Sequence, residues 1–206
     1  MQDYIRAFIA VEINDAIRAG LADVQSILKE ANGHVSWVKP QNIHSTLLFL
    51  GDLFSDSVSA AANALVQAAS ACRPLEIEIS GIGYFGSPRS PRIIWAGVAG
   101  GVTPLIELQN GIVVAALAAG LKPDTKSFKP HFTIGRVRSN RNAAALIRAI
   151  ETSMAKSFGV LSVNRVVLMR SELSAQGPEY SLLHAAALGR SINFRHPDPL
   201  AGRLPG

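Results

Sequence analysis

Two short segments of this sequence resemble each other and lie 87 residues apart. Residues 44–47 read His-Ser-Thr-Leu and residues 131–134 read His-Phe-Thr-Ile, and a Lys-Pro dipeptide stands before each, at 39–40 and at 129–130. Because the pattern occurs once in each half of the chain, we interpret the chain as a duplicated α+β unit. The two similar halves are expected to meet near residue 100.

Segments typical of strands and of helices alternate along the whole chain. Continuous or alternating apolar runs predict strands, and apolar residues three and four apart predict helices. The expected order is β-α-β-β-α-β followed by β-α-β-α-β-β. The predicted strands are 4–13, 35–38, 43–50, 75–79, 92–98, 132–137, 160–169 and 180–188, and the predicted helices run from about 15 to 33, 56 to 72, 103 to 120 and 142 to 158.

Capping residues mark the ends of two of these helices. Asn14 or Asp15 is expected to cap the first helix, because its side-chain oxygen can accept a hydrogen bond from an amide of the first turn. Gly33 suits the end of that helix, since glycine readily adopts the left-handed conformation found there. Thr103, followed by a proline, is expected to cap the third helix.

Length and composition describe an ordinary globular protein. The chain has 206 residues, of which 48% are hydrophobic and 17% are charged. We expect one bilobal domain over 1–189 and a loosely ordered C-terminal extension over 190–206. The longest apolar stretch, 112–121, has ten residues, whereas a membrane-spanning helix needs about 20. With no secretory signal at the N-terminus either, the expected location is cytoplasmic and no membrane contact is expected.

The net charge and the single cysteine limit which partners and cofactors are expected. A formal net charge of +5 favours polyanionic partners, such as RNA or nucleotides. Cys72 is the only cysteine, which excludes an internal disulfide and argues against redox chemistry. Neither His-x-Thr segment supplies a carboxylate or thiolate ligand, so no metal and no cofactor are expected. Nothing in the sequence implies an obligate protein partner.

Residues 81–86 match the dinucleotide-binding pattern GxGxxG letter for letter. A phosphate-binding glycine loop must open a helix, whose N-terminal amides hold the pyrophosphate. Here two prolines, at 88 and 91, and another predicted strand follow instead. We therefore interpret the segment as a glycine-rich connection between strands.

The paired His-x-Thr segments suit the chemistry of phosphodiesters. Successive side chains of a strand alternate between its two faces, so His44 shares a face with Thr46, and His131 shares one with Thr133. In-line displacement at phosphorus needs a base on the attacking oxygen and an acid on the leaving oxygen, and imidazole can fill either role near neutral pH. The threonine hydroxyls can hold the non-bridging oxygens. Taken singly, each histidine could instead be a buried structural residue.

Longer segments around both motifs resemble a known family. They are Arg-Ala-Phe-Ile-Ala-Val at 6–11, Leu-Leu-Phe-Leu-Gly-Asp at 47–52, Lys-Pro-His-Phe-Thr-Ile-Gly-Arg at 129–136, and the segment 171–180. These are similar to bacterial RNA 2′,3′-cyclic phosphodiesterases, first described as 2′-5′ RNA ligases, of the two-histidine phosphoesterase superfamily. The resemblance covers about residues 4–188.

The resemblance implies a fold, a reaction and two catalytic roles. The implied fold is bilobal, with two antiparallel sheets flanking a central cleft and helices outside. The implied reaction is metal-independent opening of a 2′,3′-cyclic phosphate to a 2′-phosphate, with His44 as proton donor and His131 as proton acceptor. The reverse reaction would join RNA ends through a 2′-5′ linkage.

Two further residues are candidates for contact with the substrate. Arg136 lies three residues after Thr133 and would point to the opposite face of a regular strand, unless a bulge at Gly135 re-aims it. Phe8 could stack on a base, although core packing is its alternative role. Trp37 and Tyr180 carry the same two interpretations.

The sequence thus favours an enzyme acting on RNA or nucleotides that end in a 2′,3′-cyclic phosphate. The alternative is a non-catalytic nucleotide- or RNA-binding module that uses the same cleft. An acid and a base are superfluous for binding alone, so two intact motifs favour the enzyme.

Overall fold

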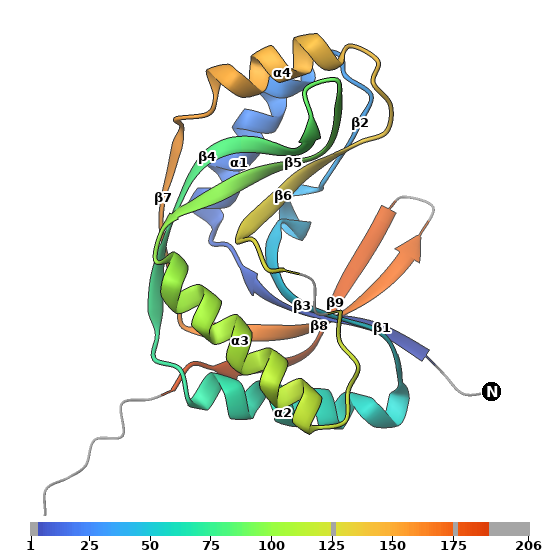
Figure 1. Cartoon of the computed structure of the whole chain (residues 1–206), viewed down its shortest axis with the longest axis vertical. Helices are drawn as coiled ribbons and strands as arrows, with labels where there is room; N and C mark the ends of the chain where they lie inside the picture. Colours follow the sequence, from blue (N-terminus) through green and yellow to red (C-terminus); the bar gives the residue numbers. More distant parts are fainter. Residues whose placement is uncertain (1–3, 125–126, 175–176, 190–206) are drawn as a thin grey trace, which may run out of the picture.

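A computed structural model describes residues 4–124, 127–174 and 177–189 (Figure 1). Within these residues the chain forms an α+β fold of strands, α-helices and two single turns of 3-10 helix. In chain order the elements are β1 (Tyr4–Glu12), α1 (Asp15–Lys29), β2 (Val35–Trp37), η1 (Pro40–Asn42), β3 (His44–Phe54), η2 (Ser55–Ser57), α2 (Val58–Ser70), β4 (Leu75–Ser87), β5 (Ser90–Gly100), α3 (Val102–Ala118), β6 (His131–Val137), α4 (Ala143–Thr152), β7 (Ser157–Val163), β8 (Arg165–Ser174) and β9 (Gly177–Ala187). The extension expected over 190–206 lies outside the described residues.

The strands form two antiparallel sheets. The first sheet, which we call sheet A, has the order β3-β1-β8-β9, and the second, sheet B, has the order β2-β6-β5-β4-β7. In sheet A, β1 lies between β3 and β8; in sheet B, β5 lies between β6 and β4 in the same arrangement. Each sheet therefore contains strands from both halves of the chain, and the expected meeting point, residue 100, falls at the end of β5.

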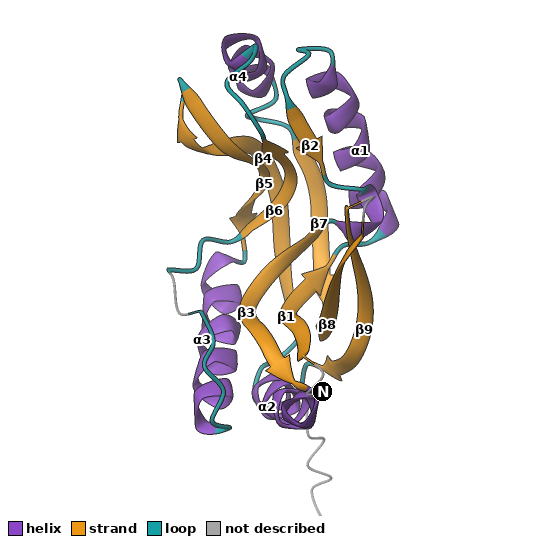
Figure 2. Cartoon of the chain, turned by 90° about the vertical axis from the view of Figure 1, so that its right-hand side faces the viewer, coloured by secondary structure: helices purple, strands orange, loops and turns teal. Residues whose placement is uncertain are grey.

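The helices cover the outer sides of the sheets (Figure 2). Helix α1 packs against β7 and α4, and α4 packs against β4, so both cover sheet B. Helices α2 and α3 pack against each other, and they also contact β8, β9 and β3 of sheet A. The buried residues of α1 include Ile17, Leu21, Val24 and Leu28, which are the positions that the apolar spacing predicts.

Two expected elements near the C-terminus differ from the structure. The single strand predicted over 160–169 is divided at Asn164, where the chain passes from β7 in sheet B to β8 in sheet A. An apolar run indicates that residues are buried, but it does not indicate in which of the two sheets they lie. The helix predicted to reach residue 158 ends at Thr152, because the carbonyl of Lys156 accepts a hydrogen bond from the Gly81 amide, which holds the following residues against β4.

Two helix ends lie one or two residues from their predicted positions. Asn14 caps α1, with its side chain accepting from the Ile17 amide at 2.9 Å. The left-handed residue after α1 is Asn32 (φ 50°) and not Gly33. The N-cap of α3 is Gly101 (φ 72°) and not Thr103, because a Cβ at residue 101 would collide with the backbone of β4.

The GxGxxG segment lies within β4 and is part of that strand, not a connection between strands; the chain continues through a tight hairpin into β5. This confirms that the segment does not open a helix. Over the described residues, no helix is both long enough and apolar enough to cross a membrane.

Candidate active site

Both His-x-Thr segments begin a strand with the predicted alternation of faces. His44 and Thr46 are half-buried at the start of β3, and Ser45 between them is fully buried. His131 and Thr133 are half-buried at the start of β6, where the residue between them, Phe132, is also fully buried. Each imidazole therefore lies beside a hydroxyl on the less buried face of its strand.

The two strands also carry a bulge at the same position after the histidine. In β3, Ala10 and Ile9 of β1 pair with Thr46 and Leu48, which leaves Leu47 as an extra residue. In β6, Trp95 and Ile94 of β5 pair with Thr133 and Gly135, which leaves Ile134 as the extra residue. A bulge shifts the alternation by one residue. The fifth residue after each histidine thus returns to the histidine's own face.

These fifth residues are Phe49 and Arg136, and both are exposed. The bulge that would re-aim Arg136 is therefore present, with Ile134 as its extra residue. Gln25 of α1 stabilises it, because its buried side-chain amide donates to the carbonyls of Ile134 at 2.8 Å and of Val38 at 2.7 Å. Phe49 has the equivalent place in β3. In the sequence, the only sign of this correspondence is that each residue lies five positions after its histidine.

Each imidazole is held through Nδ1 by a backbone carbonyl two residues earlier. Nδ1 of His44 lies 2.8 Å from the carbonyl oxygen of Asn42, and Nδ1 of His131 lies 2.6 Å from that of Lys129. A carbonyl can only accept, so Nδ1 carries the hydrogen in both rings. Nε2 is then the nitrogen that exchanges a proton. In His44 it lies 3.0 Å from the hydroxyl of Thr46.

Aromatic rings surround the two histidines differently. The His44 ring stacks on Phe8 with centroids 4.8 Å apart, and Tyr180 of β9 meets it edge-on at 5.3 Å. Phe8 is only 3% exposed, so its ring lies beneath His44 and leaves no open face for a base. His131 has one edge-on neighbour, Phe85 of β4, at 5.0 Å.

The charge of Arg136 connects the two motifs. Burial lowers the pKa of His44 and of His131, and in both rings the nearby Arg136 charge lowers the pKa further. Burial raises the pKa of Tyr180, and Arg136 opposes that rise. A charge on β6 that acts on side chains of β3 and β9 lies between the two sheets. Since β3 also packs against β6, the two imidazoles, Tyr180 and Arg136 lie near one another where the two sheets meet, a region that we call the cleft.

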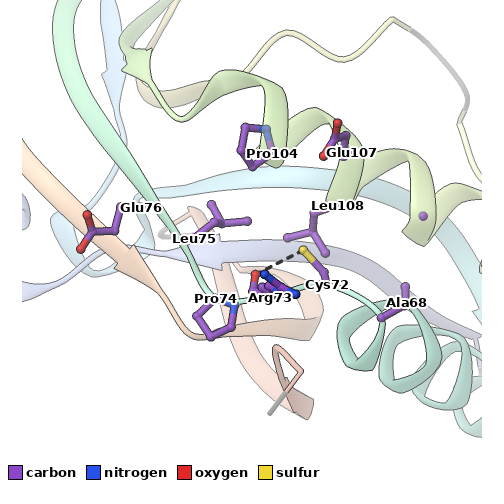
Figure 3. Close-up of a pocket in the computed structure, with 11 residues that line it drawn as sticks. Ala68, Cys72, Arg73, Pro74, Leu75, Glu76, Pro104, Glu107 and Leu108 are labelled. Carbon is purple, nitrogen blue, oxygen red and sulfur yellow. Dashed lines mark hydrogen bonds between the residues drawn. The ribbon is translucent and has the colours of Figure 1, made fainter. Parts of the chain in front are cut away.

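The remaining sequence candidates lie elsewhere. The Trp37 ring packs on Gly135 with the Lys29 ammonium 6.0 Å from it, on the side of sheet B that α1 covers. Cys72 borders a separate cavity of about 520 Å³ between α2 and α3, lined by none of the His-x-Thr residues (Figure 3). Burial raises the pKa of its thiol, and Glu107 raises it further, which keeps the thiol protonated. The described residues contain no cluster of three or more metal-ligating side chains.

The family model of LigT-like phosphoesterases matches residues 11–95 and 99–180 of this chain. The chain belongs to this family. An RNA 2′,3′-cyclic phosphodiesterase from Methanothermobacter thermautotrophicus is 34% identical over 177 residues, which are 86% of this chain and 95% of the relative. A protein of the same name from Archaeoglobus fulgidus is 36% identical, over 85% of this chain and 96% of the relative.

Crystal structures of the LigT-like fold match the same architecture. TT0787 of Thermus thermophilus superimposes with a TM-score of 0.72 at 26% identity, covering 89% of this chain and 97% of that protein. Escherichia coli LigT, solved in complex with 3′-AMP, gives a TM-score of 0.69 at 21% identity, covering 91% and 99%. These matches confirm the expected α+β fold with two antiparallel sheets.

Proposed function

We propose that this LigT-like phosphoesterase hydrolyses 2′,3′-cyclic phosphates at the ends of RNA or nucleotides and leaves a 2′-phosphate. The observation that carries the proposal is the pair of imidazoles in one cleft, each tethered at Nδ1 and each beside a threonine. The names of the curated relatives agree with this substrate class.

In the proposed mechanism, Nε2 of His131 removes a proton from water as the water oxygen bonds to phosphorus. The bond from phosphorus to the 3′ oxygen breaks, and Nε2 of His44 gives that oxygen its proton. Thr46, Thr133 and Arg136 hold the non-bridging oxygens through the transition state. The 2′ ester stays intact, and the next exchange of protons with water restores both imidazoles.

One electrostatic difference between the two imidazoles agrees with these roles: a carboxylate acts on His44 only. Glu12 pairs with His44 across β1 and β3, and its negative charge raises the pKa of His44, against the larger lowering by burial and by Arg136. A carboxylate favours the protonated, donating form of the ring. On His131 the adjacent charge is Arg136, which favours the neutral, accepting form.

Reversal of the same steps gives ligation. A 5′-hydroxyl in the place of water would attack the cyclic phosphate and form a 2′-5′ linkage. Because water is far more concentrated than RNA ends, hydrolysis is the expected outcome in solution.

Two imidazoles supply both proton transfers, so the mechanism needs no metal-activated water. We expect turnover of 2′,3′-cyclic AMP to yield 2′-AMP and to be unaffected by EDTA, as measured by chromatography that separates the 2′ and 3′ isomers. A 3′-AMP product would contradict the position of the acid. Loss of turnover on chelation, restored by a divalent ion, would contradict the two-histidine mechanism.

The same assay tests the alternative that the protein only binds nucleotides. A module that only binds would retain the cyclic nucleotide unchanged under conditions in which binding is detected by calorimetry.

A further inference from the structure

The indole of Trp95 lies on the cleft face of sheet B, one strand away from the candidate phosphate site. Trp95 of β5 pairs with Thr133 of β6 on one side and with Gly83 of β4 on the other. Side chains of residues paired across strands leave the same face of a sheet. The Trp95 side chain therefore projects into the same cleft as Thr133.

Two glycines make a flat floor beneath this ring. A Cβ at Gly83 would lie within 3.0 Å of three indole atoms, and a Cβ at Gly97 would lie 3.2 Å from another. Three ring atoms at such similar distances place that Cβ above the ring plane, so the indole lies flat on the backbone of β4 and β5. Its Nε1 has no hydrogen-bond partner among the described residues, so packing on the glycines is what orients the ring.

The indole also borders a cavity of about 480 Å³, whose lining includes Gly83 and Gly97. The cavity extends over Gly81 and Gly83 toward Met154, beyond the residues of β4 that pair with β7. No charged side chain is among the described residues that line it. An uncharged, flat-walled cavity beside an indole suits an aromatic ring and not a phosphate group.

Phe85 makes this surface continuous with the candidate active site. Its ring lies 5.5 Å from the Trp95 ring and 5.0 Å from the His131 ring, both measured between centroids. A track of rings thus leads from His131 through Phe85 to Trp95.

We propose that Trp95 is a stacking platform for the base of the nucleotide on the 5′ side of the cyclic-phosphate nucleotide. This rests on the proposed function and adds a substrate class to it, an RNA end of two or more nucleotides. The indole lies over Gly83 of β4, and β4 lies two strand spacings, about 10 Å, from β6, which carries Thr133. This distance favours the upstream base over the terminal one. The inference also accounts for Gly83, the middle glycine of the GxGxxG segment, since a side chain at residue 83 would lift the indole off the sheet.

The test compares the kcat/KM of three substrates: 2′,3′-cyclic AMP, a diadenosine dinucleotide ending in a 2′,3′-cyclic phosphate, and the same dinucleotide with an abasic upstream ribose. Stacking of a base on an aromatic side chain corresponds to about a 5- to 150-fold effect. We expect the dinucleotide to exceed the mononucleotide by a factor in this range and the abasic dinucleotide to lose that advantage. This comparison needs no substitution, so it holds even if a variant fails to fold.

The variant Trp95→Leu should remove the advantage of the dinucleotide and keep turnover of the mononucleotide, whereas Trp95→Phe should retain most of it. Trp37→Leu is the matched control, because Trp37 also packs on a glycine but on the helix-covered side of sheet B. Its ratio of dinucleotide to mononucleotide activity should equal that of the unmodified protein.

Equal loss on all three substrates in Trp95→Leu would overturn the upstream assignment and place the terminal base, or no base, on the indole. An abasic dinucleotide as good as the intact one would overturn it as well. Failure of every substrate to turn over would contradict the proposed function itself, which keeps the two failures distinct.

Discussion

The His44 face of the cleft is filled with side chains, whereas the His131 face is floored in part by glycine. On sheet A, Phe8 packs with Ala10, Val167, Met169 and Tyr180 into a small apolar cluster separate from the main core. On sheet B, the positions paired with His131 and with Trp95 are Gly97 and Gly83. One face is packed by side chains around its imidazole, and on the other the two glycines let the Trp95 indole lie flat on the sheet.

The backbone of the two faces is nevertheless the same. Each strand has its histidine tethered to a carbonyl two residues back and a bulge after the threonine. This comparison teaches that the same backbone features hold two imidazoles in equivalent places, and that the side chains around the two rings differ. The fifth residue after the histidine shows the division most simply, since it is Phe49 on one strand and the cation Arg136 on the other.

The largest effect is expected from removing either imidazole. His44→Ala and His131→Ala should each lower kcat on 2′,3′-cyclic AMP by about 10²- to 10⁴-fold, because general acid or base catalysis contributes that much. His34→Ala is the control: His34 lies outside the cleft, where its Nδ1 meets the Ser139 hydroxyl, and its loss should leave kcat unchanged. Activity that survives either cleft substitution would contradict the proposed role of that imidazole in proton transfer.

Arg136→Met should lower kcat/KM by about 10²-fold, as expected for a lost transition-state donor. It should also move the pH profile. The reaction needs one protonated and one neutral imidazole, and because burial and Arg136 lower the pKa of both rings, the optimum of kcat/KM should lie below neutral pH. Removing the cation raises both pKa values, so the optimum should move to higher pH.

The control for this prediction is Arg138→Met. The Arg138 guanidinium donates to Ser36 at 2.8 Å, away from the histidines. It should leave the pH optimum in place. A shift to lower pH in Arg136→Met would contradict the placement of its charge in the cleft.

Gln25→Leu tests the bulge on the sheet B side alone. Loss of its two hydrogen bonds leaves buried carbonyls with fewer donors, so the free energy of unfolding should fall by about 1–3 kcal/mol in denaturant titrations. Because the bulge aims Arg136, kcat/KM should fall and the pH optimum should rise, as in Arg136→Met but less. Ser26→Ala, on the exposed neighbour, serves as the control. A loss of stability with an unchanged pH optimum would contradict the claim that the bulge orients Arg136.

The smallest effect is expected at Tyr180. Its ring meets both His44 and Phe8 edge-on. Tyr180→Leu should cost about 0.5–1.5 kcal/mol of transition-state stabilisation, as an aromatic pair is lost, and Tyr180→Phe should change little. If the two variants lost kcat/KM equally, the contribution of Tyr180 would come from its hydroxyl and not from its ring.

Much of this cleft follows from the sequence, because strand periodicity places His44 with Thr46 and His131 with Thr133 without knowledge of the fold. The sequence did not predict that the chain passes from one sheet to the other at Asn164, since buried strands have the same apolar pattern in either sheet. The neighbours Phe85 and Trp95 were missed for a related reason. Their contacts depend on the register of β4 against β5, which sequence spacing alone does not set.

The division of roles between the two imidazoles can be measured with leaving groups of different basicity. A ribose oxygen needs a proton as it departs, whereas p-nitrophenolate leaves unaided, so loss of the acid is visible with the first and largely hidden with the second. The account predicts that His44→Ala is severely impaired on 2′,3′-cyclic AMP and much less impaired on a nucleoside p-nitrophenyl phosphodiester, and that His131→Ala is impaired on both. Rescue of His131→Ala by the activated substrate would exchange the roles, and equal impairment of both variants on both substrates would contradict the division itself.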